Sequence, residues 1–449
     1  MNQKSSALAL GTDNVWKLLL QYAVPSIIAM TASSLYNIID SIFIGHGVGA
    51  LAIAGLAITF PLMNLSAAFG SMVGVGASAL MSLRLGQKDY STATHILGNV
   101  LTLNTIFGIG YSVLVLLFLD PVLRFFGASN ATLPYAHDYM FIILLGNVVT
   151  HMYLGLNSLL RASGSPQKSM SLMIGSVIIN SILAPVFIFG FKWGIRGAAM
   201  ATVFAQIAML AWQIQIFAKK SNLIHFQKGT FQLKPKIVSD TMAIGISPFL
   251  MNSVSCVIVI FINQELIRYG SDLHVGAYGI INRVAFLFAM VVMGLNQGMQ
   301  PIAGYNFGAN QIDRVNKVLK YTLMLATVVM TLGFLLSELI PHEVASLFTE
   351  DKTLTQYAVA GLRIVFMFCP LVSIQMVTAN FFQSIGMAKK SIFMSLSRQL
   401  IFLLPGLILL PHFYGVKGVW YSLPVADAFS CIVASYMLVV VYRKSVVKH

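Results

Sequence analysis

Four ionisable residues lie inside long apolar runs of this sequence. Three are acids, Asp40, Glu265 and Asp427, and one is a base, Arg283. An ionisable side chain is expensive within a membrane-spanning segment, so each of them is a candidate for function by default. Such groups bind protons, cations or charged ligands, and binding changes the charge and hydrogen bonding of the cavity around them.

Asp40 belongs to a polar stripe on one helical face. Ser33, Tyr36, Asn37 and Asp40 are spaced i, i+3, i+4 and i+7 in an otherwise apolar run. Because this stripe cannot face lipid, it must line the protein interior or a water-filled cavity. Burial raises the pKa of a carboxyl group, so protonation near neutral pH becomes accessible. We therefore expect a protonation switch at Asp40; the alternative is a carboxyl group satisfied by its packing neighbours.

The other ionisable residues each permit more than one interpretation. Glu265 stands three residues before Arg268, so it either forms an ion pair at the membrane interface or takes part in coupling. Arg283 pairs with Glu265 or Asp427, or extends towards the interface. Asp427 either neutralises Arg283 or meets a cationic substrate. We expect Glu265, Arg283 and Asp427 at or near a substrate cavity.

Two further features suit a bundle that changes shape around a ligand. Pro25 shares an apolar run with Asp40, removes a backbone hydrogen bond and is expected to let the helix bend. A second set shares one face of a later run and is expected to line a soft cavity for varied ligands. This set comprises Met290, Met293, Asn296, Gln297 and Gln300.

Composition indicates an integral membrane protein. Of the 449 residues, 57% are hydrophobic and 9% are charged, whereas a soluble domain has about 25% charged residues. The net charge of +14 does not indicate nucleic acid, because the charges fall in short segments between apolar runs. The three cysteines lie in apolar runs, so we expect neither a disulfide nor a metal site from them. Residues 1–14 are polar and the first apolar run is of spanning length, so we expect no cleavable signal peptide.

The apolar runs predict an all-α fold with twelve membrane-spanning helices. A span needs about 20 mostly apolar residues, and in lipid a helix satisfies its own backbone polar groups. The alternation typical of a barrel strand is absent. The predicted spans are 15–44, 50–82, 93–119, 135–161, 168–190, 195–218, 238–268, 275–304, 317–340, 354–384, 390–411 and 415–442.

The second half of the chain repeats the first at an offset near 222 residues. Gly86 aligns with Gly308 and Tyr135 with Tyr357, for example. Each half holds six predicted spans, so the two repeats share one orientation and are expected to be related by a pseudo-two-fold axis along the membrane normal. The expected units are an N-terminal lobe at 1–218, a linker at 219–236 and a C-terminal lobe at 237–449.

Lysine and arginine residues are distributed unevenly between the two sides of the predicted bundle. Twenty of them, Arg161 and Arg398 included, fall on the side of both termini, and seven fall on the other side. Positive charge favours the cytoplasmic side, so both termini are expected there. The linker contributes five lysines, which we expect to be solvated and to touch anionic lipid headgroups.

Several catalytic and nucleotide-binding motifs are missing from the sequence. It has no Gly-x-x-x-x-Gly-Lys-Ser/Thr loop, no His-Glu-x-x-His pair and no serine or cysteine elbow. We therefore do not expect an enzyme, and energy for any transport must come from an ion gradient or the substrate's own gradient. Duplicated bundles in a bilayer are typical of secondary transporters, with the substrate site between the repeats.

Motifs along nearly the whole chain resemble those of the multidrug and toxic compound extrusion (MATE) family, and of its bacterial MepA-like subgroup. Their order across twelve spans gives the resemblance its specificity. They are Pro25, Asp40, Gly74-Val-Gly-Ala-Ser78, Arg84-Leu-Gly-Gln87, Leu160-Arg-Ala-Ser-Gly164, Asn180, Trp193-Gly-Ile-Arg-Gly-Ala-Ala199, Thr202 and Gln300-Pro-Ile-Ala-Gly-Tyr-Asn306.

The resemblance implies export of lipophilic and often cationic drugs by alternating access, in antiport with protons or sodium ions. It implies a cation site at Asp40, Asn180 and Thr202, with Asn157 as a polar neighbour. Ala184 stands where relatives have a second aspartate, which removes a charge and a ligand for sodium. The resemblance therefore favours protons over sodium, and it implies no other cofactor.

The resemblance also implies a monomer in the bacterial cytoplasmic (inner) membrane that confers antibiotic resistance. A second function of the same architecture is the flipping of a lipid-linked precursor. A flippase is expected to have a cationic cavity for phosphates, and Arg283 is the only clear intramembrane base of the sequence. The drug exporter is therefore the favoured interpretation.

Overall fold

The computed structural model describes residues 3–446, without the side chains of residues 3–7, 35–38, 50 and 441–446. Within residues 3–446 the chain is helical and contains no strand, as predicted. Each helix satisfies its own backbone polar groups, because lipid offers them no other partner. The helices pack against one another through buried apolar side chains.

The first lobe begins with a short helix and continues with six spans. Its elements are α1 (Gln3–Thr12), α2 (Val15–Gly47), α3 (Ala50–Gly86), α4 (Tyr90–Leu117), α5 (Leu119–Phe125), α6 (Leu133–Ala162), α7 (Pro166–Pro185), the π-helix η1 (Val186–Gly190) and α8 (Gly194–Ala218). Helices α7 and η1 form one span.

The second lobe repeats this order without a counterpart of α1. Its elements are α9 (Pro235–Tyr269), α10 (Asp272–Gly308), α11 (Ile312–Leu339), α12 (Pro341–Ser346), α13 (Lys352–Phe366), α14 (Cys369–Ser384), α15 (Ala388–Leu396), the π-helix η2 (Ser397–Leu403), α16 (Leu404–Tyr414) and α17 (Val416–Val446). Helices α3, α4, α5, α7 and α8 each begin 222 residues before α10, α11, α12, α15 and α17, so the offset is confirmed.

The structure contains the predicted spans with one difference. Eleven described helices are long and apolar enough to cross a membrane, and a bent pair makes a possible twelfth span. That pair is α13 and α14, which meet at an angle of 55° within the predicted span 354–384. Helices α1, α5 and α12 were not predicted, because they are too short to show a long apolar run.

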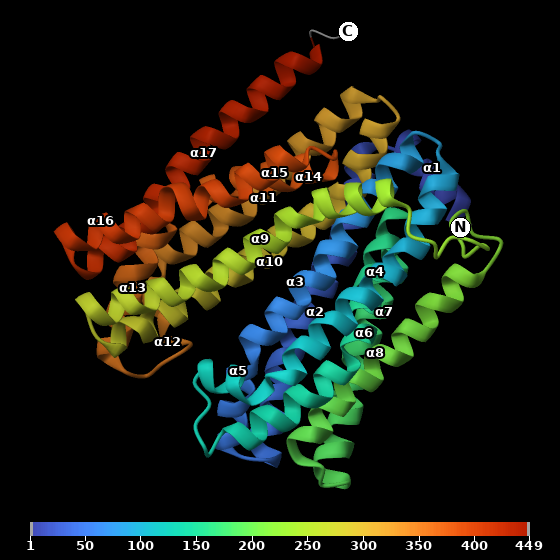
Figure 1. The fold of residues 1–449 in the computed structure, drawn as a ribbon. Helices are drawn as coiled ribbons and strands as arrows, with labels where there is room; N and C mark the ends of the chain where they lie inside the picture. The colour runs from blue at the N-terminus through green and yellow to red at the C-terminus, as the bar shows by residue number, and fades with distance from the viewer. Residues whose placement is uncertain (1–2, 447–449) are drawn as a thin grey trace.

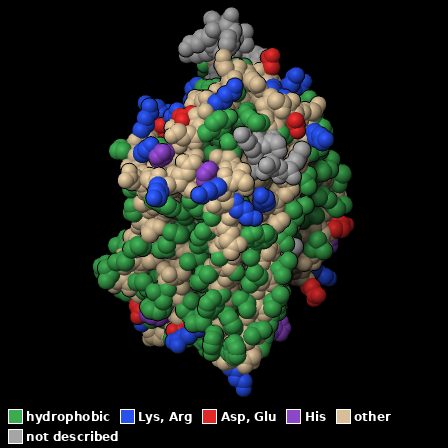
Figure 2. All heavy atoms as spheres, turned by 90° about the vertical axis from the view of Figure 1, so that its right-hand side faces the viewer, with side chains coloured by type: hydrophobic (Ala, Val, Ile, Leu, Met, Phe, Trp, Pro, Cys, Tyr) green, Lys and Arg blue, Asp and Glu red, His purple; other side chains and the backbone are tan. Residues whose placement is uncertain are grey.

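The two lobes lie side by side and diverge from one end of the molecule (Figure 1). We call this end the linker end, because it holds residues 219–234 between α8 and α9; the other is the far end. Figure 2 shows a hydrophobic band on one flank, with lysine and arginine side chains gathered above it and a few below it. This distribution suits a molecule that crosses a bilayer.

Close backbone contacts hold the lobes together in the half of the molecule next to the linker end. A Cβ at Gly298 of α10 would lie 2.6 Å from the Cα of Ala23 in α2. A Cβ at Gly245 of α9 would overlap the backbone oxygen of Met72 in α3. Only glycine fits where two backbones approach this closely.

These contacts follow the internal symmetry of the chain. A Cβ at Gly86 would overlap the backbone oxygen of Tyr305, and a Cβ at Gly308 would overlap that of Leu83. Each residue of the first pair is related by the 222-residue offset to one residue of the second. In the far half, by contrast, the described glycines that meet another residue meet only atoms of their own lobe; examples are Gly45, Gly47, Gly55 and Gly276.

Helix α1 belongs to the first lobe by sequence but contacts the second. Asn306 of α10 donates a hydrogen bond of 2.9 Å to the backbone oxygen of Leu10. Arg314 of α11 donates to the same oxygen at 3.0 Å and to that of Asp13 at 2.7 Å. The end of α1 therefore has hydrogen-bond partners in the opposite lobe.

A larger side chain at Gly245 is expected to push the lobes apart at the linker end, because no side chain fits against Met72. Spin labels at Lys88 and Asn310, both exposed and related by the repeat, report this separation by pulsed electron paramagnetic resonance. Gly245→Leu should lengthen the label distance by several ångströms.

Gly279→Leu is the matched control, since a Cβ at Gly279 meets no other atom within 4 Å. It should leave the label distance unchanged. Equal distances in both variants would contradict the close packing of α9 on α3.

Candidate functional site

Asp40 of α2 is buried in the first lobe. Its side chain is 5% exposed, and its Oδ1 atom has no hydrogen-bond partner among the described residues. A buried carboxylate without a partner is unfavourable as an anion, and a bound proton or cation removes that cost. Asp40 therefore has the chemistry of a cation-binding group.

A hydrogen bond between Asn180 and Thr202 joins α7 to α8. The amide Nδ2 of Asn180 donates a hydrogen bond of 2.9 Å to Thr202 Oγ1. Ile44 of α2, Ala184 of α7 and Ala198 of α8 belong to one apolar cluster.

Each polar residue of this set lies four positions from its cluster member, towards the linker end. Asp40 precedes Ile44, Asn180 precedes Ala184, and Thr202 follows Ala198 on a helix that runs in the opposite direction. Because four residues make about one helical turn, the three polar side chains lie one turn closer to the linker end than the apolar cluster. Their oxygens are hard donors of the kind that bind sodium, with backbone or water oxygens to complete the shell.

The structure does not test the predicted roles of Tyr36, Asn37 and Pro25. The side chains of Tyr36 and Asn37 lie outside the described residues. Helix α2 continues without a break through Pro25, so bending there stays a prediction.

Asn157 lies apart from the Asp40 site, contrary to what the resemblance implied. Its Oδ1 accepts a hydrogen bond from Ser169, which stands eleven residues before Asn180 on α7. That separation is roughly 16 Å along the helix. Arg161, the last residue of the predicted span 135–161, donates to the same Ser169 hydroxyl at 3.2 Å and is buried. Asn157 therefore belongs to a cluster near the linker end.

Asp427 pairs with Arg398, so the predicted pairing of Asp427 with Arg283 is wrong. Arg398 Nε donates a hydrogen bond of 2.6 Å to Asp427 Oδ1, and the Asp427 side chain is 4% exposed. Arg398 lies in the π-helix η2, within the predicted span 390–411, although it was counted with the charges on the side of both termini. π-Helices are rare and frequently occur at functional sites.

Glu265 pairs with Arg268 and not with Arg283. The two charged groups lie 3.8 Å apart, about one turn along α9, as one of the two predicted roles of Glu265 requires. Arg283 is exposed on α10 and has no described ion pair. Glu265, Arg283 and Asp427 therefore do not form one charged cluster.

The predicted cavity face of α10 lies against the opposite lobe. Ser34 of α2 donates to Met290 Sδ at 2.6 Å, and Gln297 donates to Met30 Sδ at 3.4 Å. Gln300 donates to the backbone oxygen of Val75 in α3 at 3.3 Å. Met290, Met293 and Gln297 remain half-buried, which places a soft and partly polar surface between the lobes.

A buried histidine in α6 was not among the residues predicted from the sequence. His151 is 0% exposed; its Nε2 lies 3.0 Å from Ser66 Oγ, and its Nδ1 has no partner among the described residues. Ser66 also donates to Asn147 at 2.5 Å. Its position in the middle of a predicted span was the signal that singles it out.

A family model and a curated protein match most of this chain. The family model described as MatE matches residues 25–186 and 243–408. The multidrug export protein MepA of Staphylococcus aureus (strain MSSA476) is 28% identical over 429 residues, which cover 96% of this chain and 94% of that protein.

Two solved structures show a similar fold. A MATE protein in the bent conformation superimposes with a TM-score of 0.92 at 22% identity and covers 98% of this chain and 99% of its own. The MATE multidrug transporter DinF-BH gives a TM-score of 0.87 at 34% identity and covers 96% of both chains.

The ion pair between Arg398 and Asp427 predicts a large effect of removing one partner. Asp427→Asn leaves the guanidinium of Arg398, which is 27% exposed, without its counter-charge and is expected to cost about 3 kcal/mol, the lower end for a buried pair. The midpoint of thermal unfolding of the purified protein in detergent measures this loss. The double variant Arg398→Met with Asp427→Leu is expected to recover most of it, because no charge remains buried.

Arg268→Gln is the control, since it breaks an ion pair whose arginine is 70% exposed. Its expected cost is under about 1 kcal/mol. A similar loss in Asp427→Asn and Arg268→Gln would show that the buried pair contributes no more than a surface pair.

Proposed function

Since this chain belongs to the MatE family, we propose that it is a MepA-like multidrug efflux transporter that works by cation antiport. It exports lipophilic and often cationic compounds across the bacterial cytoplasmic membrane as a monomer. The observation that carries the proposal is the buried Asp40 carboxyl group, whose Oδ1 has no partner among the described residues and which lies one helical turn from the same apolar cluster as the Asn180–Thr202 hydrogen bond. Cation binding there is the step that couples an ion gradient to export.

The proposed coupling ion is the proton. Sodium prefers several oxygen ligands, and the buried Ala184 contributes only a methyl group where relatives have a carboxylate. A single carboxyl group is sufficient to bind and release a proton. Asp40, Asn180 and Thr202 remain the residues that would hold a sodium ion if sodium is used instead.

The way the lobes touch supports the proposal of alternating access. Their close backbone contacts lie in the linker half, while the described far-half glycines contact only their own lobes. With both termini in the cytoplasm, as the lysine and arginine distribution favours, this is a state closed towards the cytoplasm. We propose that a second state opens these contacts, so that substrate reaches the half-buried face of Met290, Met293 and Gln297.

The charges within the second lobe argue against a flippase for a phosphate-bearing lipid. Such a carrier needs unneutralised positive charge in its cavity. Arg398 is paired with Asp427, and Arg283 is exposed on α10. Among the described residues, neither arginine supplies a cationic cavity between the lobes.

Asp40→Asn is expected to abolish coupled export, because the amide neither binds nor releases a proton and keeps the size of the side chain. Ethidium efflux from proteoliposomes is measured with an imposed proton gradient or sodium gradient, each applied alone. Efflux driven by the proton gradient and lost in Asp40→Asn is the expected result.

Glu265→Gln is the control for that experiment, since it makes the same change at the acid paired with Arg268, and its efflux should persist. A requirement of efflux for the sodium gradient would identify sodium, and not the proton, as the coupling ion. Normal efflux by Asp40→Asn would overturn the coupling role, and no efflux under either gradient would return weight to the flippase.

Asn180 and Asn157 are expected to differ in their effect on export. Asn180→Ala removes the hydrogen bond to Thr202 and should lower the coupled rate roughly fivefold, the equivalent of about 1 kcal/mol for one hydrogen bond between neutral groups. Asn157→Ala acts on Ser169 and should stay within about twofold of the parent. Initial efflux rates at matched protein content measure both, and a larger loss from Asn157→Ala would contradict the proposed location of the site.

A further inference from the structure

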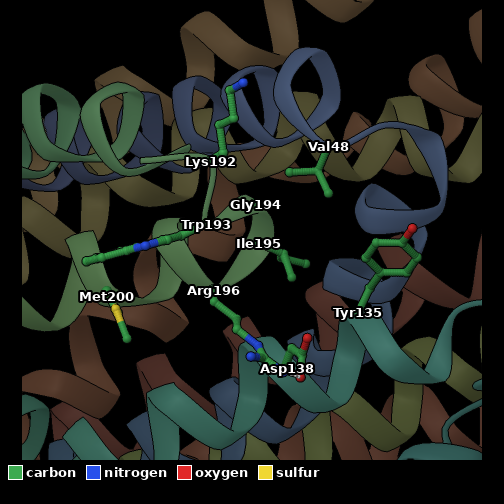
Figure 3. Close-up of a pocket in the computed structure, with 9 residues that line it drawn as sticks. All are labelled: Val48, Tyr135, Asp138, Lys192, Trp193, Gly194, Ile195, Arg196 and Met200. Atoms are coloured by element: carbon green, nitrogen blue, oxygen red, sulfur yellow. Dashed lines mark hydrogen bonds and ion pairs between the residues drawn. The ribbon is translucent and has the colours of Figure 1, made fainter. Parts of the chain in front are cut away.

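A pocket of about 540 Å³ opens at the far end of the first lobe (Figure 3). It lies where the end of α2, the start of α6 and the start of α8 meet. Its lining combines apolar, aromatic and charged side chains: Val48, Tyr135, Asp138, Lys192, Trp193, Gly194, Ile195, Arg196 and Met200. No step of the transport cycle proposed above uses it.

The charged side chains of the pocket are one acid and two bases. Arg196 donates to Asp138 Oδ1 at 2.8 Å, and Figure 3 shows the two side chains directed at each other. Lys192 is exposed and forms no ion pair among the described residues. It also holds a φ of +57°, a backbone conformation that costs energy in a residue with a side chain. The pocket therefore has an excess of positive charge.

The second lobe shows that the fold does not require a charge at the positions of Lys192 and Asp138. Gly415 has a φ of +56° and begins the same turn as Gly194, whose φ is +54°. Tyr357 corresponds to Tyr135 by the repeat. Ala360 stands in place of Asp138, however, and Phe413 in place of Lys192.

One architecture thus exists with and without Lys192 and Asp138. The turn and its tyrosine serve both lobes, and a base, Lys417, stands in place of Arg196. A role in folding would be needed equally in both lobes, so the difference points to binding.

An aromatic surface continues from the rim of the pocket. The ring of Trp193 lies 5.1 Å from that of Phe191 and 5.2 Å from that of Phe187. Trp193 is 45% exposed and Phe191 is 57% exposed. Tryptophan and tyrosine at the end of a spanning helix lie at the level of lipid headgroups. The pocket and this surface together offer a polar end and an apolar flank.

We propose that this pocket binds the phosphate headgroup of an anionic phospholipid in the leaflet at the far end of the molecule. The headgroup phosphate contacts Lys192 and Arg196, and the hydrocarbon chains lie over Phe191 and the neighbouring apolar surface. Basic pockets among membrane helices bind lipid headgroups in this way. The bound lipid joins the ends of α2, α6 and α8 above the Asp40 site.

The test is saturable binding of short-chain phosphatidylglycerol to the purified protein, counted by native mass spectrometry. Lys192→Gln should weaken binding roughly fivefold, the worth of one basic residue near a headgroup. Lys192→Arg should retain it. Lys417→Gln is the matched control, because Lys417 is an exposed base at the corresponding turn of the second lobe, and it should leave binding unchanged.

A second measurement locates the lipid chains. Phosphatidylglycerol with brominated chains should quench the fluorescence of Trp193, and Trp193→Phe should remove that part of the quenching. Equal affinity in Lys192→Gln and the parent would overturn the proposal. So would glycerol phosphate binding as tightly as the lipid, or tetraphenylphosphonium displacing the lipid in a manner that depends on Asp138.

Discussion

Hydrocarbon offers no hydrogen-bond partner, and the cost of an unsatisfied polar group there governs this structure from the backbone outwards. Within residues 3–446 the chain is helical for that reason. The same cost explains why Arg398 and Asp427 are found together at 2.6 Å inside the second lobe. It also makes Asp40 conspicuous, because its Oδ1 is buried without a partner among the described residues. Reversible binding of a proton or cation at this oxygen removes the cost of leaving it buried and unpaired.

Most of the architecture follows from two features of the sequence, which are apolar run length and internal repetition. Runs of spanning length located the ends of α3 and α10 to within a few residues. The alignment of Gly86 with Gly308 predicted two lobes whose elements begin 222 residues apart. Both features are local or one-dimensional, so they survive without knowledge of which helices touch.

The parts that could not be predicted depend on contacts between helices. Arg398 lies eight residues into the predicted span 390–411 and was counted with the charges on the side of both termini. Only the packing of η2 against α17 shows that Arg398 meets Asp427. Asn157 matched a family position, but its partner is Ser169, far from Asn180 along α7. Arg283 was a reasonable partner for Asp427 by charge alone, and its position on α10 excludes that choice. Helix register and rotation, which no apolar run encodes, decide each of these cases.

The contact of α1 with Asn306 and Arg314 gives the lobes a second connection besides the covalent segment 219–234. Both connections are at the same end of the molecule, so they close a ring of protein there. A ring limits how far its two halves can separate, while the opposite end carries no such restraint from these two connections. The lobes can therefore separate less at the linker end than at the far end. Wider separation at the linker end requires α1 first to break its hydrogen bonds to the second lobe.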